Sequence, residues 1–340
     1  MGQAATVRSG RLVWIGGGGA ATVGGSPEVA AVGQGGLLDL VPHPEFGEGD
    51  NRWIYLTYAK ATREGFATAL GRGRLVEGGS SGPARAGWEE LFVMDAPTDS
   101  TRHFGLRIVF GSNEYLYMTV GERGDRNRAQ DPGDHAGSTL RFAADGTPAG
   151  VAAEAAAGRE VFAAAATIGE SALPSLYSIG HRNPHGIAVH PETGAIWQSE
   201  HGPRGGDELK IVREGENYGW PVVSYGTEYS SEEPIGDPPD QHPEVVPPVT
   251  YWGPTSIAPA GMTFYSADRF AQWRGDLFIG ALAGRHVRRL ELDGETVTAQ
   301  ESLLEEAGWR VRDVEEGPQG YLWIITDEAS GGLYRLEPAR

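Results

Sequence analysis

Hydrophobic and polar residues alternate in several short segments, and each segment follows a turn rich in Gly, Asn or Asp. The segments cover residues 51–58, 113–122, 194–202, 275–282 and 320–328. Alternation with a period of two is typical of β-strands that bury one face. The segments recur at intervals of roughly 45 to 80 residues, which suits propeller blades with loops of variable length. We therefore predict an all-β chain and favour a β-propeller over a β-sandwich or a two-domain β protein.

Helical periodicity is weak along the chain. The Ala-rich stretch at 151–166 predicts a surface helix, and the acidic, Pro-rich stretch at 226–248 predicts a long loop. No linker divides the sequence, so we expect one domain over residues 1–340. Gly occurs 51 times without a regular period, which indicates many tight turns and favours short strands over helices.

Composition and charge narrow the possible functions. The formal net charge is −18, and an acidic surface repels nucleic-acid phosphates, so nucleic-acid binding is not expected. An anionic cofactor would need a local basic cluster in such a chain. Cys is absent, which excludes disulfides and thiolate metal sites. We find no apolar run long enough to span a membrane and no signal-peptide core near the start.

The string HRNPH at 181–185 concentrates polar chemistry in one short loop. Arg182 offers a planar fork of donors suited to carboxylates, and Asn183 adds a donor and an acceptor. The alternative is turn chemistry, because Asn-Pro commonly begins a turn. His181 and His185 flank the pair, but two histidines without further ligands do not make a zinc site.

A second loop, SEHGPRGGDELK at 199–210, has the features of a calcium-binding segment. Its Gly-Pro pair can hold backbone carbonyls outward, and Glu200, Asp207 and Glu208 add negative charge. A surface loop with solvated charges explains the same residues equally well. The spacing is not that of an EF-hand.

Two further positions are candidates for polar roles in a site. His103 directly precedes an apolar strand and has a side chain suited to a general base, although a solvated loop histidine is the simpler interpretation. Gln34 lies in a Gly-framed turn, where its amide could face a ligand or cap the turn.

The segment WRVRDV at 309–314 places two arginines two residues apart. On a strand, Arg310 and Arg312 share one face, and their guanidinium groups repel each other unless an anion lies between them. The alternative is pairing with acidic neighbours such as Glu315 and Glu316.

Taken together and in order, these segments resemble the soluble quinoprotein sugar dehydrogenases, the aldose branch of the glucose/sorbosone dehydrogenase family. The motifs that carry the resemblance are GQGGLLD, RHFG, GHRNP, SEHGPRGGDE, NYGWP, YWGPTSIAP, LFIGAL and WRVRDV. The resemblance implies a six-bladed β-propeller that binds pyrroloquinoline quinone (PQQ) and calcium at the mouth of its central channel. It also implies oxidation of aldose sugars at the anomeric carbon to lactones.

The resemblance assigns roles by motif. His103 would take the proton of the anomeric hydroxyl, with Glu122 orienting it, and Arg182 would stabilise negative charge on the quinone. The residues implied to contact the cofactor are Gln34, Arg182, Asn183, His201, Asp207, Arg310 and Arg312. The backbone carbonyls of Gly202 and Pro203 would bind calcium, and Trp252 would lie beside the sugar.

The sequence departs from the family pattern at two places. Ala283 stands where the glucose branch has a lysine that contacts the cofactor, and Arg285 is the candidate substitute. The chain also lacks the strand that relatives place before the segment matching 7–12. We therefore expect the first blade to be incomplete at the N-terminus.

The resemblance also sets expectations about partners and location. We expect a monomer that passes electrons to an external acceptor such as a dye, a quinone or a small redox protein. The expected location is the periplasm or the exterior, with any targeting segment absent from this chain. The alternatives are a calcium-dependent propeller lactonase and a noncatalytic binding propeller derived from the enzyme.

Overall fold

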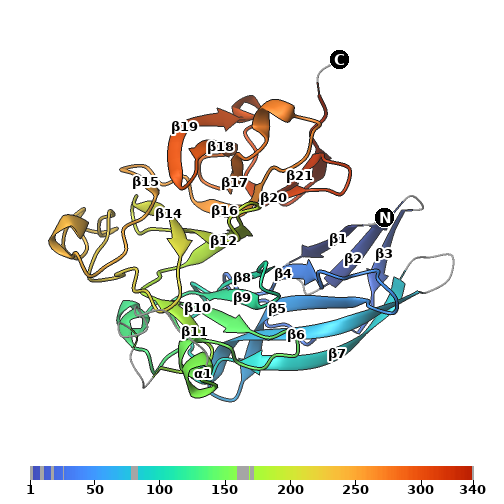
Figure 1. Ribbon diagram of the computed structural model, residues 1–340, viewed down its shortest axis with the longest axis horizontal. Coiled ribbons are helices and arrows are strands. Elements are labelled where there is room, and N and C mark those ends of the chain that lie inside the picture. The colour runs from blue at the N-terminus through green and yellow to red at the C-terminus, as the bar shows by residue number, and fades with distance from the viewer. Residues whose placement is uncertain are drawn as a thin grey trace.

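The computed structural model describes residues 3–7, 11–16, 19–25, 27–77, 83–158, 168 and 172–338, and the regular structure among them is mainly antiparallel β-sheet (Figure 1). The first sheet contains β1 (Gln3–Val7), β2 (Arg11–Gly16) and β3 (Gly19–Val23). The second contains β4 (Leu37–Pro42), β5 (Trp53–Thr62), β6 (Gly65–Glu77) and β7 (Pro83–Val93). The third contains β8 (Gly105–Phe110), β9 (Leu116–Val120), β10 (Ser138–Phe142) and β11 (Leu176–Ile179).

The second half of the chain repeats this arrangement. The fourth sheet contains β12 (Pro184–Val189), β13 (Ile196–Glu200), β14 (Asp207–Val212) and β15 (Thr250–Trp252). The fifth contains β16 (Pro259–Phe264), β17 (Leu277–Ala281), β18 (His286–Asp293) and β19 (Thr296–Leu303). The last contains β20 (Val311–Glu316), β21 (Leu322–Thr326) and β22 (Leu333–Arg335).

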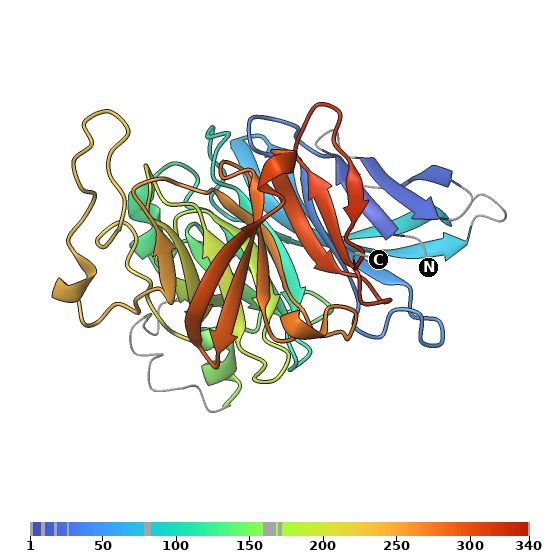
Figure 2. The ribbon, with the colours of Figure 1, turned by 90° about the horizontal axis from the view of Figure 1, so that it is seen from above.

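The sheets form a β-propeller with five blades. The first strands of the last five sheets contact one another in the order β4, β8, β12, β16 and β20, so they line the centre (Figures 1 and 2). The N-terminal sheet supplies no strand to this row and packs against the first blade through contacts of β1 with β4 and of β3 with β7. The prediction of six blades is therefore wrong, because the incomplete N-terminal sheet lacks an innermost strand.

The alternating segments are confirmed as strands, and each has the same place in its blade. The first overlaps β5 and the other four contain β9, β13, β17 and β21, and each of these is the second strand of its blade. A second strand is paired on both sides, and every residue of β9, β13 and β17 is buried, so their apolar residues are clearly recognisable in the sequence.

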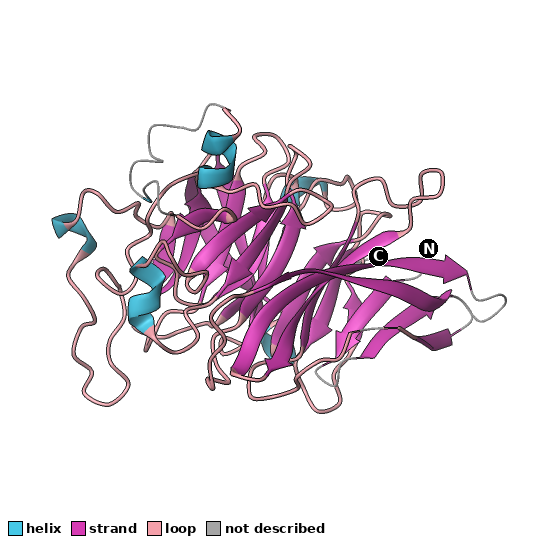
Figure 3. Ribbon diagram, turned by 90° about the horizontal axis from the view of Figure 1, so that it is seen from below, coloured by secondary structure: helices cyan, strands magenta, loops and turns pink. Residues whose placement is uncertain are grey.

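Helices contribute little to the described part of the chain (Figure 3). The predicted helix at 151–166 is confirmed only over α1 (Val151–Ala156), and residues 159–166 lie outside the described residues. The stretch at 226–248 is a long loop containing the short 3-10 helix η3 (Pro239–Gln241), and Figure 2 shows it in gold extending from the blades. Among the described helices, none has the length and apolar character needed to cross a bilayer.

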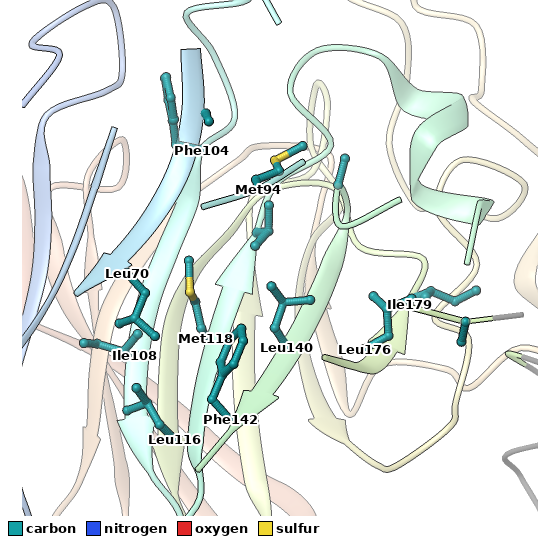
Figure 4. Close-up of a cluster of buried hydrophobic side chains, with 14 of the residues drawn as sticks. Leu70, Met94, Phe104, Ile108, Leu116, Met118, Leu140, Phe142, Leu176 and Ile179 are labelled. Atoms are coloured by element: carbon teal, nitrogen blue, oxygen red, sulfur yellow. The ribbon is translucent and has the colours of Figure 1, made fainter. Parts of the chain in front are cut away.

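Apolar side chains fill the space between neighbouring blades. Figure 4 shows one such cluster, in which Leu70 of β6 and Ile108 of β8 lie near Met118, Leu140 and Phe142. All of these side chains are buried. Burying one such side chain contributes roughly 1.5–3 kcal/mol, so this packing fixes the blades that carry the polar loops above them.

A single arginine links four blades at the centre of the propeller. From β8, Nη1 of Arg107 lies 2.7 Å from Oδ2 of Asp313 and 3.3 Å from Oδ1 of Asp39. Its Nε donates to the His185 carbonyl at 2.9 Å and its Nη2 donates to the Arg312 carbonyl at 3.0 Å. A cavity of about 360 Å³ opens beside this group. Arg107 thus fixes the backbone at two positions that also belong to the candidate site.

Candidate active site

His103 and Glu122 form a buried pair at the ends of two adjacent strands. β8 and β9 pair with Gly105 opposite Val120, which brings the residues just outside the strands together. Nδ1 of His103 lies 2.5 Å from Oε2 of Glu122. Burial lowers the pKa of His103, while the Glu122 carboxylate acts in the opposite direction. A neutral His103 therefore carries its proton on Nδ1 and keeps Nε2 as an acceptor.

The backbone around His103 is held in an unusual conformation. His103 has φ of 52°, in the left-handed region that non-glycine residues seldom adopt. Its N–H donates to Oε1 of Gln34 at 2.7 Å, and the Gln34 N–H donates to the Thr101 carbonyl at 2.8 Å. The Gln34 side chain thus supports the separate loop that carries His103 and does not cap its own turn. Its contact with a ligand stays a prediction.

The loop after β11 brings Arg182 and Asn183 to the same place. The Arg182 carbonyl accepts a hydrogen bond from the Glu122 N–H at 2.9 Å, and Oδ1 of Asn183 accepts one from the Gly105 N–H at 3.3 Å. A Cβ at Gly121 would lie 2.2 Å from the His103 carbonyl oxygen and 2.9 Å from Oδ1 of Asn183, so this close approach requires glycine.

The Arg182 side chain is buried and has spare donor capacity. Its Nη1 donates to the His201 carbonyl at 3.0 Å, and its Cζ lies 5.4 Å from the ring centre of Trp220. Its Nε has no hydrogen-bond partner among the described residues. An unsatisfied buried donor is costly, which indicates a place where a polar ligand would be bound favourably.

The ring of His201 lies among the other polar groups of the site. It stacks on His185 with a centroid distance of 4.1 Å, and its Nε2 lies 2.8 Å from the Pro259 carbonyl oxygen. Burial and the nearby cations Arg182 and Arg312 lower its pKa to about 3, so the ring is neutral near pH 7. His103 also acts on this pKa, which places it within electrostatic range of His201.

Asp207 shapes the loop that contains Gly202 and Pro203. Its Oδ1 accepts from the Gly202 N–H at 3.0 Å, while Oδ2 accepts from Oγ of Ser256 at 2.6 Å and from the Ala258 N–H at 2.9 Å. A Cβ at Gly202 would lie 2.2 Å from the Gly206 carbonyl, so the loop is tightly folded. The carboxylate of Asp207 is therefore already engaged by protein donors.

The other two acidic residues of this segment form a buried ion cluster. Nζ of Lys210 lies 2.5 Å from Oε1 of Glu200 and 2.7 Å from Oε2 of Glu208. Burial raises the pKa of Glu200, but Lys210 and His181 outweigh it and bring the pKa to about 2. Neither alternative from the sequence, a calcium site or solvated charges, describes these two carboxylates. Among the described residues, no group of three His, Asp or Glu side chains is placed to hold a metal.

Arg310 and Arg312 meet at one carboxylate. Oδ2 of Asp327 lies 3.2 Å from Nη2 of Arg310 and 3.0 Å from Nη2 of Arg312. The shared face is thus present, but the anion is Asp327 rather than Glu315 or Glu316. The two arginine side chains remain 40% and 28% exposed, respectively, so both are accessible to a bound ligand.

The Trp252 backbone pairs with Asp207, but its side chain is buried in apolar packing. Its side chain is 8% exposed, packs in a hydrophobic cluster and donates from Nε1 to Oε1 of Gln300 at 3.0 Å. The neighbouring Tyr251 is 49% exposed. Strand alternation points the Trp252 ring into the core, which argues against a sugar contact, and that contact stays a prediction.

Ala283, where the sequence departs from the family pattern, and Arg285, its candidate substitute, lie on the surface. Ala283 is exposed, and its N–H donates to the Ile257 carbonyl at 3.0 Å. Nη2 of Arg285 lies 3.5 Å from Oε1 of Glu328, the residue after Asp327. Glu328, the partner of Arg285, is thus adjacent in sequence to Asp327, the partner of the two arginines. That Arg285 takes the place of the family lysine stays a prediction.

Several important residues were not found from the sequence. Ser256 and Asp327 each bind a residue that the motifs had identified, but they do so from a different segment of the chain. Lys210 lies inside the segment 199–210, but its pairing with Glu200 and Glu208 was not predicted. Arg123 follows Glu122 directly and also contacts the His103 loop. Adjacency to a candidate residue was the one signal that could have indicated Arg123.

Comparisons with known proteins show which proteins the chain resembles. The family model described as Glucose / Sorbosone dehydrogenase matches residues 3–335. Aldose sugar dehydrogenase YliI of Escherichia coli (strain K12) is 39% identical over 345 residues, covering 99% of this chain and 87% of that protein. Quinoprotein glucose dehydrogenase B of Acinetobacter calcoaceticus is 27% identical over 220 residues, covering 58% of this chain and 42% of that protein.

A similar structure is also known. The crystal structure of the soluble aldose sugar dehydrogenase from Escherichia coli, in its apo form, superposes with a TM-score of 0.87 at 36% identity. The superposition covers 99% of this chain and 92% of that chain.

Proposed function

The chain belongs to the glucose/sorbosone dehydrogenase family and is an oxidoreductase of that family, and from this premise we propose that it oxidises aldose sugars to lactones with PQQ and calcium. The observation that carries the proposal is the buried pair of His103 and Glu122 beside the Arg182 guanidinium. An imidazole held by a carboxylate, next to a fixed cation, is suited to take a proton while negative charge develops nearby.

The donors around this pair fit an anionic quinone. Arg182 has a buried Nε with no hydrogen-bond partner in the part of the chain that the structure describes, and the guanidinium groups of Arg310 and Arg312 converge while remaining partly exposed. This local positive charge occurs in a chain whose formal net charge is −18. We infer that Arg310 and Arg312 bind the carboxylates of PQQ, and that Gln34, Asn183, His201 and Asp207 line or shape its site.

Calcium would be held mainly by backbone oxygens. The Gly202 and Pro203 carbonyls are the candidate ligands, and Asp207 fixes their loop through the Gly202 N–H. Hard cations accept backbone carbonyls together with ligand and water oxygens, so carboxylates need not dominate the site. When bound, PQQ would supply a two-electron acceptor for hydride, and calcium would supply Lewis-acid polarisation.

The residues of the chain then have defined tasks. His103 accepts the proton of the anomeric hydroxyl at Nε2, because Nδ1 is engaged by Glu122. Glu122 stabilises the imidazolium that results. Arg182 stabilises the negative charge that hydride transfer creates. The sugar loses one proton and one hydride and becomes a lactone, and an external acceptor removes the electrons.

Reconstitution tests the proposal directly. Apoprotein is mixed with PQQ and calcium, the visible spectrum is recorded, and dye reduction is followed with several aldoses. We expect a spectrum of bound quinone and turnover that requires both additions. The proposal would be rejected if no bound-quinone spectrum appeared and no aldose were oxidised.

The same experiment separates the alternatives. Hydrolysis of a lactone with calcium alone would indicate the propeller lactonase. Binding of a sugar by calorimetry, without dye reduction in the presence of PQQ and calcium, would indicate a noncatalytic binding protein.

A further inference from the structure

The loop of residues 100–104 must be held by its surroundings. His103 has φ of 52°, and a left-handed conformation at a non-glycine residue persists only where neighbouring groups impose it. Gln34 bonds the His103 N–H, and Glu122 bonds the imidazole. The Gln34 N–H also bonds the Thr101 carbonyl, so these contacts leave the Ser100 and Arg102 carbonyls to another partner.

Arg123 supplies that partner. Its Nη2 donates to the Ser100 carbonyl at 2.6 Å, and its Nη1 donates to the Arg102 carbonyl. Its Cζ lies 3.4 Å from the centre of the Phe104 ring. The contacts therefore lie on both sides of His103 along the chain. Because Glu122 and Arg123 are consecutive, one short segment holds both the ring and the backbone of this histidine.

This contact requires a buried cation in an unfavourable setting. Arg123 is 1% exposed, and its Nε has no hydrogen-bond partner among the described residues. No ion pair joins Arg123 to a carboxylate within the described part of the chain. Burial, reinforced by the nearby Arg128, lowers its pKa to about 10. An apolar side chain would fill this space at a lower electrostatic cost. The burial of a guanidinium here is therefore best explained by the bonds that it makes to the Ser100 and Arg102 carbonyls.

We propose that Arg123 is a positioning residue that keeps His103 in the orientation needed to act as a base. The proposal rests on the proposed function of His103. Arg123 touches neither substrate nor cofactor in this role and acts through the loop of residues 100–104. A shift of about 1 Å in a reacting group is enough to lower turnover roughly a hundredfold.

Three substitutions test the role in the full chain. Arg123→Met keeps the apolar stem and removes both carbonyl bonds and the ring contact of the guanidinium. Arg123→Lys keeps the charge but cannot make the planar fork. Arg269→Met is the matched control, because Arg269 also lies over an aromatic ring, that of Tyr321, and donates to the Gln319 carbonyl far from His103.

The first measurement compares kcat, sugar KM and PQQ affinity of the reconstituted proteins. We expect Arg123→Met to lower kcat by about 10- to 100-fold, with sugar KM and PQQ affinity within about twofold. Arg123→Lys should be intermediate and Arg269→Met close to the parent. An unchanged kcat in Arg123→Met, or an equal loss of PQQ affinity, would overturn the proposal. If circular dichroism shows that Arg123→Met does not fold, parent-like kcat in Arg123→Lys overturns it instead.

The second measurement does not depend on turnover. The imidazole signals of His103 are followed by NMR in the apoproteins, and we expect them to shift and broaden in Arg123→Met but not in Arg269→Met. Unchanged signals would contradict the positioning role even if no aldose is oxidised. If the parent showed no turnover but the expected NMR change occurred, the proposed function would be rejected, while the positioning of His103 by Arg123 would still be supported.

Discussion

The Glu122 carboxylate approaches Nδ1 of His103 to 2.5 Å in a place that water reaches poorly. Burial lowers the pKa of His103 and Glu122 raises it, while the cations Arg182 and Arg102 lower it further. His185 and His201 also interact with this imidazole. The net effect is a base that is neutral, and therefore competent, at a pH below the ordinary histidine value.

The pH profile of turnover follows from this balance. We expect kcat/KM of the reconstituted protein to rise with pH and to level off, with a midpoint below 6.5, the ordinary value of histidine. In Glu122→Gln the raising effect of the carboxylate is lost, so the midpoint should move lower and the plateau should fall by about 10- to 100-fold. Substitution of the exposed Glu306 by Gln is the control. A midpoint that moves upward in Glu122→Gln would contradict this account.

Loss of Arg312 should weaken cofactor binding. Its guanidinium is one of two that converge on Asp327, and a charge-assisted bond to a ligand carboxylate would be lost in Arg312→Gln. We expect the dissociation constant of PQQ, measured by titrating apoprotein in the presence of calcium, to rise by about tenfold or more. Arg335→Gln, at an exposed ion pair with Glu337, should leave it unchanged. Equal affinity in Arg312→Gln and the parent would count against the proposed clamp.

Removal of Lys210 should destabilise the protein. Lys210 is 1% exposed and neutralises Glu200 and Glu208, which would otherwise be buried carboxylates without a cation. We expect Lys210→Met to lower the free energy of unfolding by about 3–5 kcal/mol near pH 7, measured by chemical denaturation.

The pH dependence and a control follow from the same cluster. Glu200 has a folded pKa of about 2 against an ordinary value of 4.5, so its contribution to stability is present above 4.5 and is lost as the pH falls toward 2. The defect of Lys210→Met should therefore shrink in acid. Arg213→Met removes an exposed pair with Glu295 and should change the free energy of unfolding by less than about 1 kcal/mol. A defect no larger than that of the control would refute the prediction.

Trp252 should affect stability and not sugar binding. Its indole is buried and donates to Gln300, so Trp252→Phe leaves space in the core and removes this bond. We expect a loss of about 1–3 kcal/mol in the free energy of unfolding, with sugar KM unchanged. Tyr251→Phe, on the exposed side of the same strand, is the control for stability. A rise in sugar KM in Trp252→Phe alone would restore the original prediction.

The fold could be predicted as far as local pattern extends. Each of the five alternating segments became the second strand of one blade, because alternation and turn residues act over a few positions. The sixth blade came from the family resemblance and had no matching segment in this chain. The N-terminal sheet pairs β1 with β2 and β2 with β3, but no strand before β1 supplies an inner edge in the described residues.

The site could be predicted one motif at a time, but not its partners. HRNP and RHFG indicated Arg182 and His103, and the structure brings both beside Glu122. Asp207 seemed free to face a ligand, yet Ser256 and Ala258 occupy its carboxylate from a distant segment. The burial of Trp252 could not be predicted for a different reason, because β15 has only three residues, too few for alternation to reveal which side is buried.

Arg107 links the first blade to the last. It contacts Asp39 in the first blade and Asp313 in the last, and it also holds the carbonyls of His185 and Arg312. If those two blades moved apart, the bonds from Arg107 to the carbonyls of Arg312 and of His185, whose ring stacks on His201, would be stretched. The spacing of these two blades and the positions of His185 and Arg312 are therefore coupled through Arg107, a side chain that needs no contact with sugar or quinone.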